Sequence, residues 1–127
     1  MSNAYAKKLF TSAAIFNFLV AFGFLAQIPP LGVILAIDSY PPTANAFLQI
    51  TFLIVVLCGW AYLKVANDPI KYQPYITLGI LIKAIFVVVI FAYFLMGKIT
   101  WILPFLVSTD AVWIVLFYRF EKSHKSV

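Results

Sequence analysis

The sequence predicts an all-α fold: an integral membrane four-helix bundle of up-down-up-down topology, with cytoplasmic N- and C-termini. This prediction depends on an apolar composition, on four apolar segments of membrane-spanning length, and on the placement of basic residues. Of the 127 residues, 65% are hydrophobic and 10% are charged, and the mean hydropathy is +1.03. Because soluble domains are about 45–50% apolar and about 25% charged, most of this chain is expected to lie in lipid.

Four segments have the length that a bilayer requires, since a hydrocarbon core of about 30 Å is crossed by roughly 20 helical residues. The segments are 9–28, 43–63, 76–97 and 99–118. The third contains Lys83, the fourth contains Asp110, and the first two contain no charged residue. Backbone polar groups in lipid must be bonded within their own segment, so each is expected to be a helix and residues 1–127 a single transmembrane domain.

Basic residues predict how the bundle is oriented. Most of them flank the two termini and the link between the second and third segments: Lys7, Lys8, Lys64, Lys71, Arg119, Lys122 and Lys125. The loops on the opposite side contain only Lys98. Since cytoplasmic loops carry the excess of Lys and Arg, the chain is expected in the inner (cytoplasmic) membrane of a bacterium with both termini inside. A cleaved N-terminal signal peptide is the competing interpretation, which the full span length of the first apolar run disfavours.

The links between the segments differ in character. The outer loop, 29–42, is bracketed by two Pro-Pro pairs, and its apolar stretch 31–37 is too short to span. That stretch is expected to be a short cap helix, the alternative being a continuation of the first span past a kink. Between the third and fourth segments only Gly97 and Lys98 intervene, which predicts a tight antiparallel hairpin.

Lys83 and Asp110 require an explanation, because an ionisable group within a span costs about 2.5–3.5 kcal/mol at mid-helix. Counted from the cytoplasmic ends at 1.5 Å per residue, Lys83 lies about 12 Å deep and Asp110 about 13.5 Å deep. Asn17, counted from Lys8, reaches the same depth of about 13.5 Å. The sequence therefore predicts an intramembrane polar node of Lys83, Asp110 and Asn17. Such a node either holds helices in register or takes part in function.

Pro104 is the remaining irregularity in the apolar segments. A proline at this position leaves the carbonyl of Thr100 without its helical partner, which predicts a bend in the fourth span. The bend would shape an outward-opening cleft lined by Gln27 and Gln49, whose amides need water or each other.

The sequence contains no catalytic or metal-binding motif. There is no G-x-S-x-G, Walker or H-E-x-x-H pattern, and the only histidine and the only cysteine are His124 and Cys58. No catalytic residue and no metal site is predicted. The net charge of +5 does not indicate nucleic-acid binding, because the nine Lys and Arg residues are scattered between apolar runs.

One segment resembles a known group of proteins. The stretch NDPIKYQPYITLGILIKA, followed by an aspartate in the last helix, resembles small uncharacterised bacterial four-helix membrane proteins, and the whole chain is more loosely similar to DoxX-like proteins. The resemblance depends on Pro69, Tyr72, Pro74, Gly79, Lys83 and Asp110. It implies a four-helix bundle and little about activity. Small multidrug-resistance transporters are of similar length, but their first helix carries an essential glutamate where this chain offers only Asn17.

These observations favour a non-catalytic membrane protein, either an accessory subunit or a binder of a small lipophilic ligand. The alternative is a proton-coupled small transporter or an accessory of a membrane oxidoreductase that uses the Lys83–Asp110 pair. No cofactor is evident, although a quinone or another lipophilic molecule would suit the setting. The expected partners are the lipid bilayer and either other membrane subunits or further copies of the chain.

Overall fold

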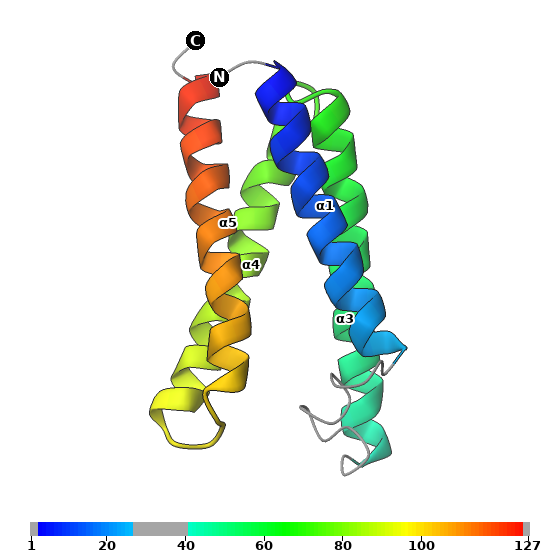
Figure 1. Ribbon diagram of the computed structural model, residues 1–127, viewed down its shortest axis with the longest axis vertical. Coiled ribbons are helices and arrows are strands. Elements are labelled where there is room, and N and C mark those ends of the chain that lie inside the picture. Colours follow the sequence, from blue (N-terminus) through cyan, green and yellow to red (C-terminus); the bar gives the residue numbers. More distant parts are fainter. Residues whose placement is uncertain (1–2, 27–40, 126–127) are drawn as a thin grey trace.

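The computed structural model describes residues 3–26 and 41–125, which form a bundle of four helices (Figure 1). The helices are α1 (Asn3–Leu25), α3 (Pro42–Asn67), α4 (Gln73–Leu95) and α5 (Ile102–Lys125). Each contains a stretch long and apolar enough to cross a membrane. Successive helices run in opposite directions, so α1 begins and α5 ends at the same end of the bundle (Figure 1). The short cap helix expected at 31–37 lies outside the described residues.

At the end of the bundle where the chain begins and ends, the helices extend beyond the apolar segments that predicted them. At the other end, α1, α4 and α5 fall short of those segments by two or three residues. α1 begins at Asn3, so Lys7 and Lys8 belong to its first turns, and α3 continues through Lys64 to Asn67. Hydropathy marks the lipid-facing length, whereas helix ends depend on local backbone bonding. Prolines stand at two of these starts: Pro42 is the first residue of α3, and Pro74 is the second residue of α4. Both positions suit proline, whose missing N–H would be unbonded there anyway.

The link between α4 and α5 is longer than the two residues expected, since it runs from 96 to 101. Gly97, two residues after the last residue of α4, has a backbone in the left-handed region, with φ of 71°. Its N–H donates to the Phe94 carbonyl at 3.0 Å, and the N–H of Lys98 donates to the Tyr93 carbonyl at 3.0 Å. These two bonds satisfy carbonyls of the last turn in the pattern of a Schellman cap, which requires a residue such as glycine at this point.

Pro104 does not bend the interior of α5, contrary to the kink predicted from the sequence. α5 begins at Ile102, so Pro104 lies in its first turn and Thr100 lies outside the helix. An N–H at this position would have no partner within the helix, so the proline removes nothing. The next residue, Phe105, already donates its N–H to the Trp101 carbonyl at 3.0 Å.

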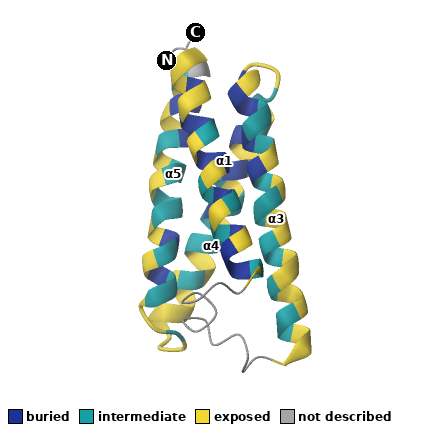
Figure 2. Cartoon of the chain, turned by 45° about the vertical axis from the view of Figure 1, so that its right-hand side comes forward, coloured by how far each residue is buried: buried dark blue, intermediate teal, exposed yellow. Residues whose placement is uncertain are grey.

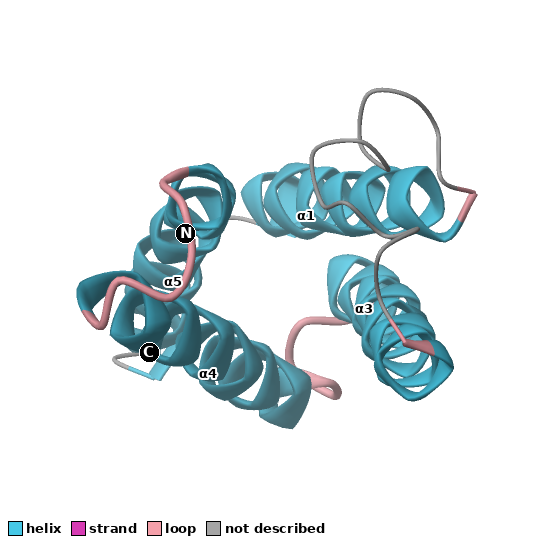
Figure 3. Ribbon diagram, turned by 90° about the horizontal axis from the view of Figure 1, so that it is seen from below, coloured by secondary structure: helices cyan, strands magenta, loops and turns pink. Residues whose placement is uncertain are grey.

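The four helices are arranged as two pairs around a central space (Figure 3). α1 packs mainly against α3 and α4 against α5, while α3 and α4 touch over a shorter region. The pairs meet through a cluster that we call the terminal core, because it lies at the end where the chain begins and ends. Its buried members are Ala6, Leu9, Phe10, Ala13, Ala14, Tyr62, Val65, Ala66, Ile76, Phe117 and Phe120.

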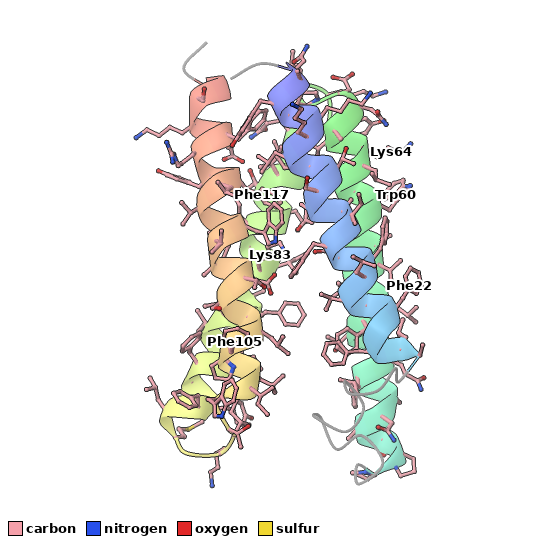
Figure 4. The ribbon with its side chains drawn as sticks, in the orientation of Figure 1. Phe22, Trp60, Lys64, Lys83, Phe105 and Phe117 are labelled. Carbon is pink, nitrogen blue, oxygen red and sulfur yellow. The ribbon has the colours of Figure 1, made fainter. Side chains whose placement is uncertain are left out.

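Aromatic rings join the two pairs within the terminal core. The ring of Phe10 stacks on that of Phe117 with centroids 4.8 Å apart, and Tyr62 meets Phe117 edge to face at 5.1 Å. The outward faces of the helices are largely exposed and apolar (Figure 2). Phe22 and Trp60, for example, are 55% and 47% exposed and point away from the bundle (Figure 4). Apolar outer surfaces of this extent suit hydrocarbon as the surrounding solvent.

Candidate functional site

The polar node predicted from depth counting is assembled in the structure. The ammonium nitrogen of Lys83, on α4, lies 2.8 Å from Oδ1 of Asp110, on α5, which is the distance of a charge-assisted hydrogen bond. Lys83 is only 4% exposed and points between the two helix pairs (Figure 4). The side chain of Asp110 keeps 20% exposure. An opposite charge this close offsets much of the cost of placing either group at membrane depth.

Asn17 connects the ion pair to the other helix pair. Its amide oxygen, on α1, accepts a longer hydrogen bond of 3.4 Å from the Lys83 ammonium. Its amide nitrogen donates to the backbone carbonyl of Val55, on α3, at 3.3 Å. Buried Ala13, Ala14 and Ala21 flank Asn17 on the same face of α1. Such small residues let α1 approach α3 closely enough for a side-chain amide to reach a backbone carbonyl.

Tyr62 lies directly beside the polar node. It is 1% exposed, and the ammonium of Lys83 lies 5.8 Å from the centre of its ring, within range of a cation–π interaction. The ring fits against α4 because residue 79 is glycine. A Cβ at Gly79 would lie 2.7 Å from Cε1 and 2.8 Å from the hydroxyl oxygen of Tyr62. The hydroxyl is buried and has no hydrogen-bond partner among the described residues.

A cavity of about 570 Å³ lies between the helix pairs, and the polar node forms part of its wall. We call it the central cavity. Its lining comes from 16–24 of α1, 48–62 of α3, 82–90 of α4 and 103–110 of α5. Since α1 and α4 run away from the terminal core and α3 and α5 run toward it, the stretches of α1, α4 and α5 lie mainly in the opposite half of the bundle, and that of α3 runs from there to Tyr62. The terminal core therefore closes one end of the cavity, with Tyr62 belonging to both.

Most of the cavity wall is apolar. The aromatic and aliphatic lining residues are Phe16, Leu19, Val20, Phe24, Leu48, Phe52, Val55, Ile82, Phe86, Ile90, Leu103, Leu106 and Val107. Among them, Phe24 stacks on Phe52 with ring centroids 4.7 Å apart. The hydroxyls of Thr51 and Thr109 donate to their own helices, at 2.8 Å to the Phe47 carbonyl and 2.6 Å to the Leu106 carbonyl. The hydrogen-bonding capacity of the cavity is thus concentrated at the node end.

The outer cleft predicted from Gln27, Gln49 and Pro104 stays a prediction, because it depends in part on a residue that the structure does not describe. Gln49 is exposed and does not line the cavity, while Pro104 is buried in the first turn of α5. Gln27 lies outside the described residues.

Two features escaped prediction from the sequence. The first is Tyr62, whose burial depends on Gly79 of another helix. The only signal of this contact in the sequence is a glycine one turn before Lys83. The second is Glu121, which is 9% exposed and accepts a hydrogen bond of 2.6 Å from the Thr77 hydroxyl. This bond ties the end of α5 to the start of α4. Within 3–26 and 41–125, no group of three His, Cys, Asp or Glu side chains is placed to hold a metal ion.

Comparison with known proteins finds no counterpart: neither a family model, nor a curated protein, nor a solved structure matches the chain.

Proposed function

We propose that the protein is a small multi-pass membrane protein that binds a lipophilic molecule between its two helix pairs and has no catalytic activity of its own. The observation that carries this proposal is the central cavity of about 570 Å³, apolar along most of its wall and polar at one end. Ligand sites in proteins are concave, mostly apolar and furnished with a few polar groups that fix orientation, and their volumes are about 300–1,000 Å³. The central cavity has each of these properties.

The membrane setting of the proposal follows from the four apolar helices and the distribution of basic residues. We place the protein in the inner membrane of a bacterium, with both termini and the 68–72 link in the cytoplasm. In that orientation the terminal core faces the cytoplasm, and the cavity occupies the outer half of the membrane. A lipophile dissolved in the bilayer would then reach its site from the hydrocarbon without crossing water.

The test is purification in native lipids followed by extraction and mass spectrometry. The proposal expects a specific lipophile, such as a quinone or pigment, at near-stoichiometric amount and enriched over its level in the surrounding membrane. Filling the cavity with Thr51→Trp should remove it. The matched control is Leu53→Trp, two residues away on the same helix, because Leu53 is 58% exposed and points outward. Bulk lipid alone, or a lipophile retained equally by both variants, would contradict the proposal.

A second candidate is a proton-coupled transporter or an accessory of a membrane oxidoreductase. It is favoured by the 20% exposure of Asp110, since a carboxylate on the cavity wall can exchange a proton with a guest molecule. Replacing both charges, with Lys83→Met and Asp110→Leu, separates the two candidates. A binding protein should keep its lipophile to a measurable extent, whereas a transporter or redox accessory should fold normally and lose coupled transport or electron transfer.

A further inference from the structure

We infer that the molecule bound in the central cavity is an uncharged lipophile whose polar head is a carbonyl oxygen, and that the ammonium of Lys83 donates a hydrogen bond to it. The inference rests on the proposed function and assigns the lipophilic ligand of the protein to a chemical class. Three properties of the cavity support it: its balance of charge, its count of hydrogen-bond donors, and the position of the polar node relative to the apolar wall.

Charge balance excludes an ionic ligand. Among the described residues that line the cavity, only Lys83 and Asp110 are charged, and they neutralise each other at 2.8 Å. A carboxylate or ammonium guest would have to leave water and meet no counter-charge of its own, or would have to break the existing pair. Either step leaves one buried charge uncompensated, which is strongly unfavourable in an apolar site. An uncharged head meets neither penalty.

Some donor hydrogens at the node have no partner among the described residues. The Lys83 ammonium has three N–H groups, and the structure supplies acceptors for two: Asp110 at 2.8 Å and Asn17 at 3.4 Å. The second contact is long enough to be weak. Asn17 has two amide N–H groups and uses one, toward the Val55 carbonyl. The described bonds thus leave three donor hydrogens at the node, one each on Lys83, Asn17 and the hydroxyl of Tyr62. A guest carbonyl oxygen can accept from the free N–H of Lys83, whereas unused lone pairs on Asp110 and Asn17 are tolerated more readily than buried N–H groups without a partner.

The position of the node sets the orientation of the guest. Lys83, Asp110 and Asn17 lie next to Tyr62 at the closed end of the cavity, whereas the rest of the wall, on the side away from the terminal core, is apolar. On α1 the lining continues from Asn17 to Phe24, seven residues farther along. At 1.5 Å per residue this apolar wall is about 10 Å long. The carbonyl head is therefore directed toward the terminal core, and the hydrocarbon part extends away from it.

The experiment is a competition between two probes that differ by one carbonyl: 1-(2-naphthyl)nonan-1-one and 2-nonylnaphthalene. Purified protein is given both at equal micellar mole fraction, and the complexes are counted by native mass spectrometry. Binding to the Thr51→Trp variant is subtracted as binding to the outer surface. We expect the ketone to be favoured about tenfold, as a hydrogen bond to a charged group predicts. With Lys83→Met and Asp110→Leu combined, the ratio should fall to about one.

Isotope-edited infrared spectroscopy of the ¹³C=O-labelled ketone supplies a second readout in the unmodified protein, which keeps the test independent of whether the double variant folds. A carbonyl band shifted to lower wavenumber than in empty micelles supports the inference, and an unshifted band overturns it. Equal specific binding of ketone and hydrocarbon overturns the carbonyl assignment alone and leaves the proposed function intact. Preference for 6-nonyl-2-naphthoate over the ketone overturns the uncharged assignment. Absence of binding above the Thr51→Trp level overturns the proposed function and this inference together.

Discussion

At the scale of single residues, the molecule is organised around one buried ammonium group. Lys83 lies in the middle of α4, 4% exposed, and Asp110 supplies its counter-charge at 2.8 Å. A pair of this kind contributes little net stability, because the desolvation of two charges offsets most of their attraction. Removing one partner destabilises the protein, since the remaining charged group is left in an apolar interior without a counter-ion.

Lys83→Met and Asp110→Leu should therefore each lower the free energy of unfolding by about 3 kcal/mol, while the double variant should lie close to the parent. The measurement is reversible unfolding in mixed micelles at increasing mole fraction of SDS. Lys98→Met, at the exposed 96–101 link, is the control for loss of a lysine and should change little. A double variant as unstable as the sum of the single variants would show that the two charges act independently.

At the scale of elements, the packing of Tyr62 of α3 against α4 depends on one glycine. Gly79 leaves space for the buried ring of Tyr62, and a Cβ there would lie 2.7 Å from that ring. The ring is 1% exposed and also packs edge to face against Phe117, so it has little room to move. This contact joins the first helix pair to the second immediately beside the polar node.

Gly79→Ala should destabilise the protein by about 1–3 kcal/mol through overpacking, even though alanine favours a helix by about 0.5–1 kcal/mol over glycine. In a Tyr62→Leu background the same substitution should cost much less, because the smaller side chain leaves room for the added methyl group. Unfolding of the parent and the three variants in SDS gives the double-mutant cycle. If Gly79→Ala lowers the free energy of unfolding equally in both backgrounds, the destabilisation does not arise from contact with the Tyr62 ring.

The link between α4 and α5 makes a separate prediction at the same scale. Gly97 has φ of 71°, and a Cβ added there would meet no described atom within 4 Å beyond its chain neighbours, so conformation alone decides what a side chain costs. Gly97→Ala should lower the free energy of unfolding by about 1–2 kcal/mol, the penalty of the left-handed region for an L-residue. Lys98→Ala, one residue farther along, should change it by less than about 0.5 kcal/mol. Equal effects of the two substitutions would contradict the Schellman cap.

At the scale of the whole molecule, two helix pairs are joined by the terminal core at one end and by a smaller contact of Phe24 with Leu103 and Leu106 toward the other end, with the cavity between them. The terminal core closes the end at which the chain begins and ends, and the 68–72 link lies at that end as well (Figure 1). The 96–101 link lies at the opposite end. This arrangement gives the proposed orientation a structural meaning, because the described cavity lies mainly in the outer half of the bundle.

Thiol labelling of cells tests that orientation. In a Cys58→Ala background, which removes the only cysteine, Lys98→Cys should react with a membrane-impermeant maleimide added to spheroplasts. Asn67→Cys, equally exposed but at the other end of the bundle, should react only after the membrane is permeabilised. The reverse pattern would invert the assignment of the termini, and labelling of both sites in intact spheroplasts would exclude a transmembrane arrangement.

The helices and the polar node were accessible to sequence analysis for one physical reason: helical rise is constant. Segment lengths predicted four helices, and residue counts from the span ends predicted that Lys83, Asp110 and Asn17 share a depth, where the structure brings them into contact. The links were less predictable. Residues 96–101 remain apolar enough to continue a span, and the chain turns there because of backbone bonds at Gly97 that hydropathy does not report.

The central cavity and the position of Tyr62 could not be predicted from one sequence. Both depend on how side chains of four helices fill the space between them, which is a property of packing angles rather than of any single segment. Pro104 illustrates the same limit. Its effect depends on whether it stands inside a helix or in the first turn, and that was decided by a helix start at Ile102 within a continuous apolar run.

The ion pair is formed within one helix pair, and this has a consequence for how the chain enters a membrane. Lys83 and Asp110 are 27 residues apart, on consecutive helices joined by a short link, so α4 and α5 can insert together as a hairpin with no net charge at its centre. The span of α1 and that of α3 need no such help, and Asn17 is already bonded to the Val55 carbonyl within that pair. The ion pair can thus form within one half and the Asn17–Val55 bond within the other before the halves meet. We therefore expect the chain to enter the membrane as two hairpins that then dock, and to be reconstituted from two separately expressed fragments.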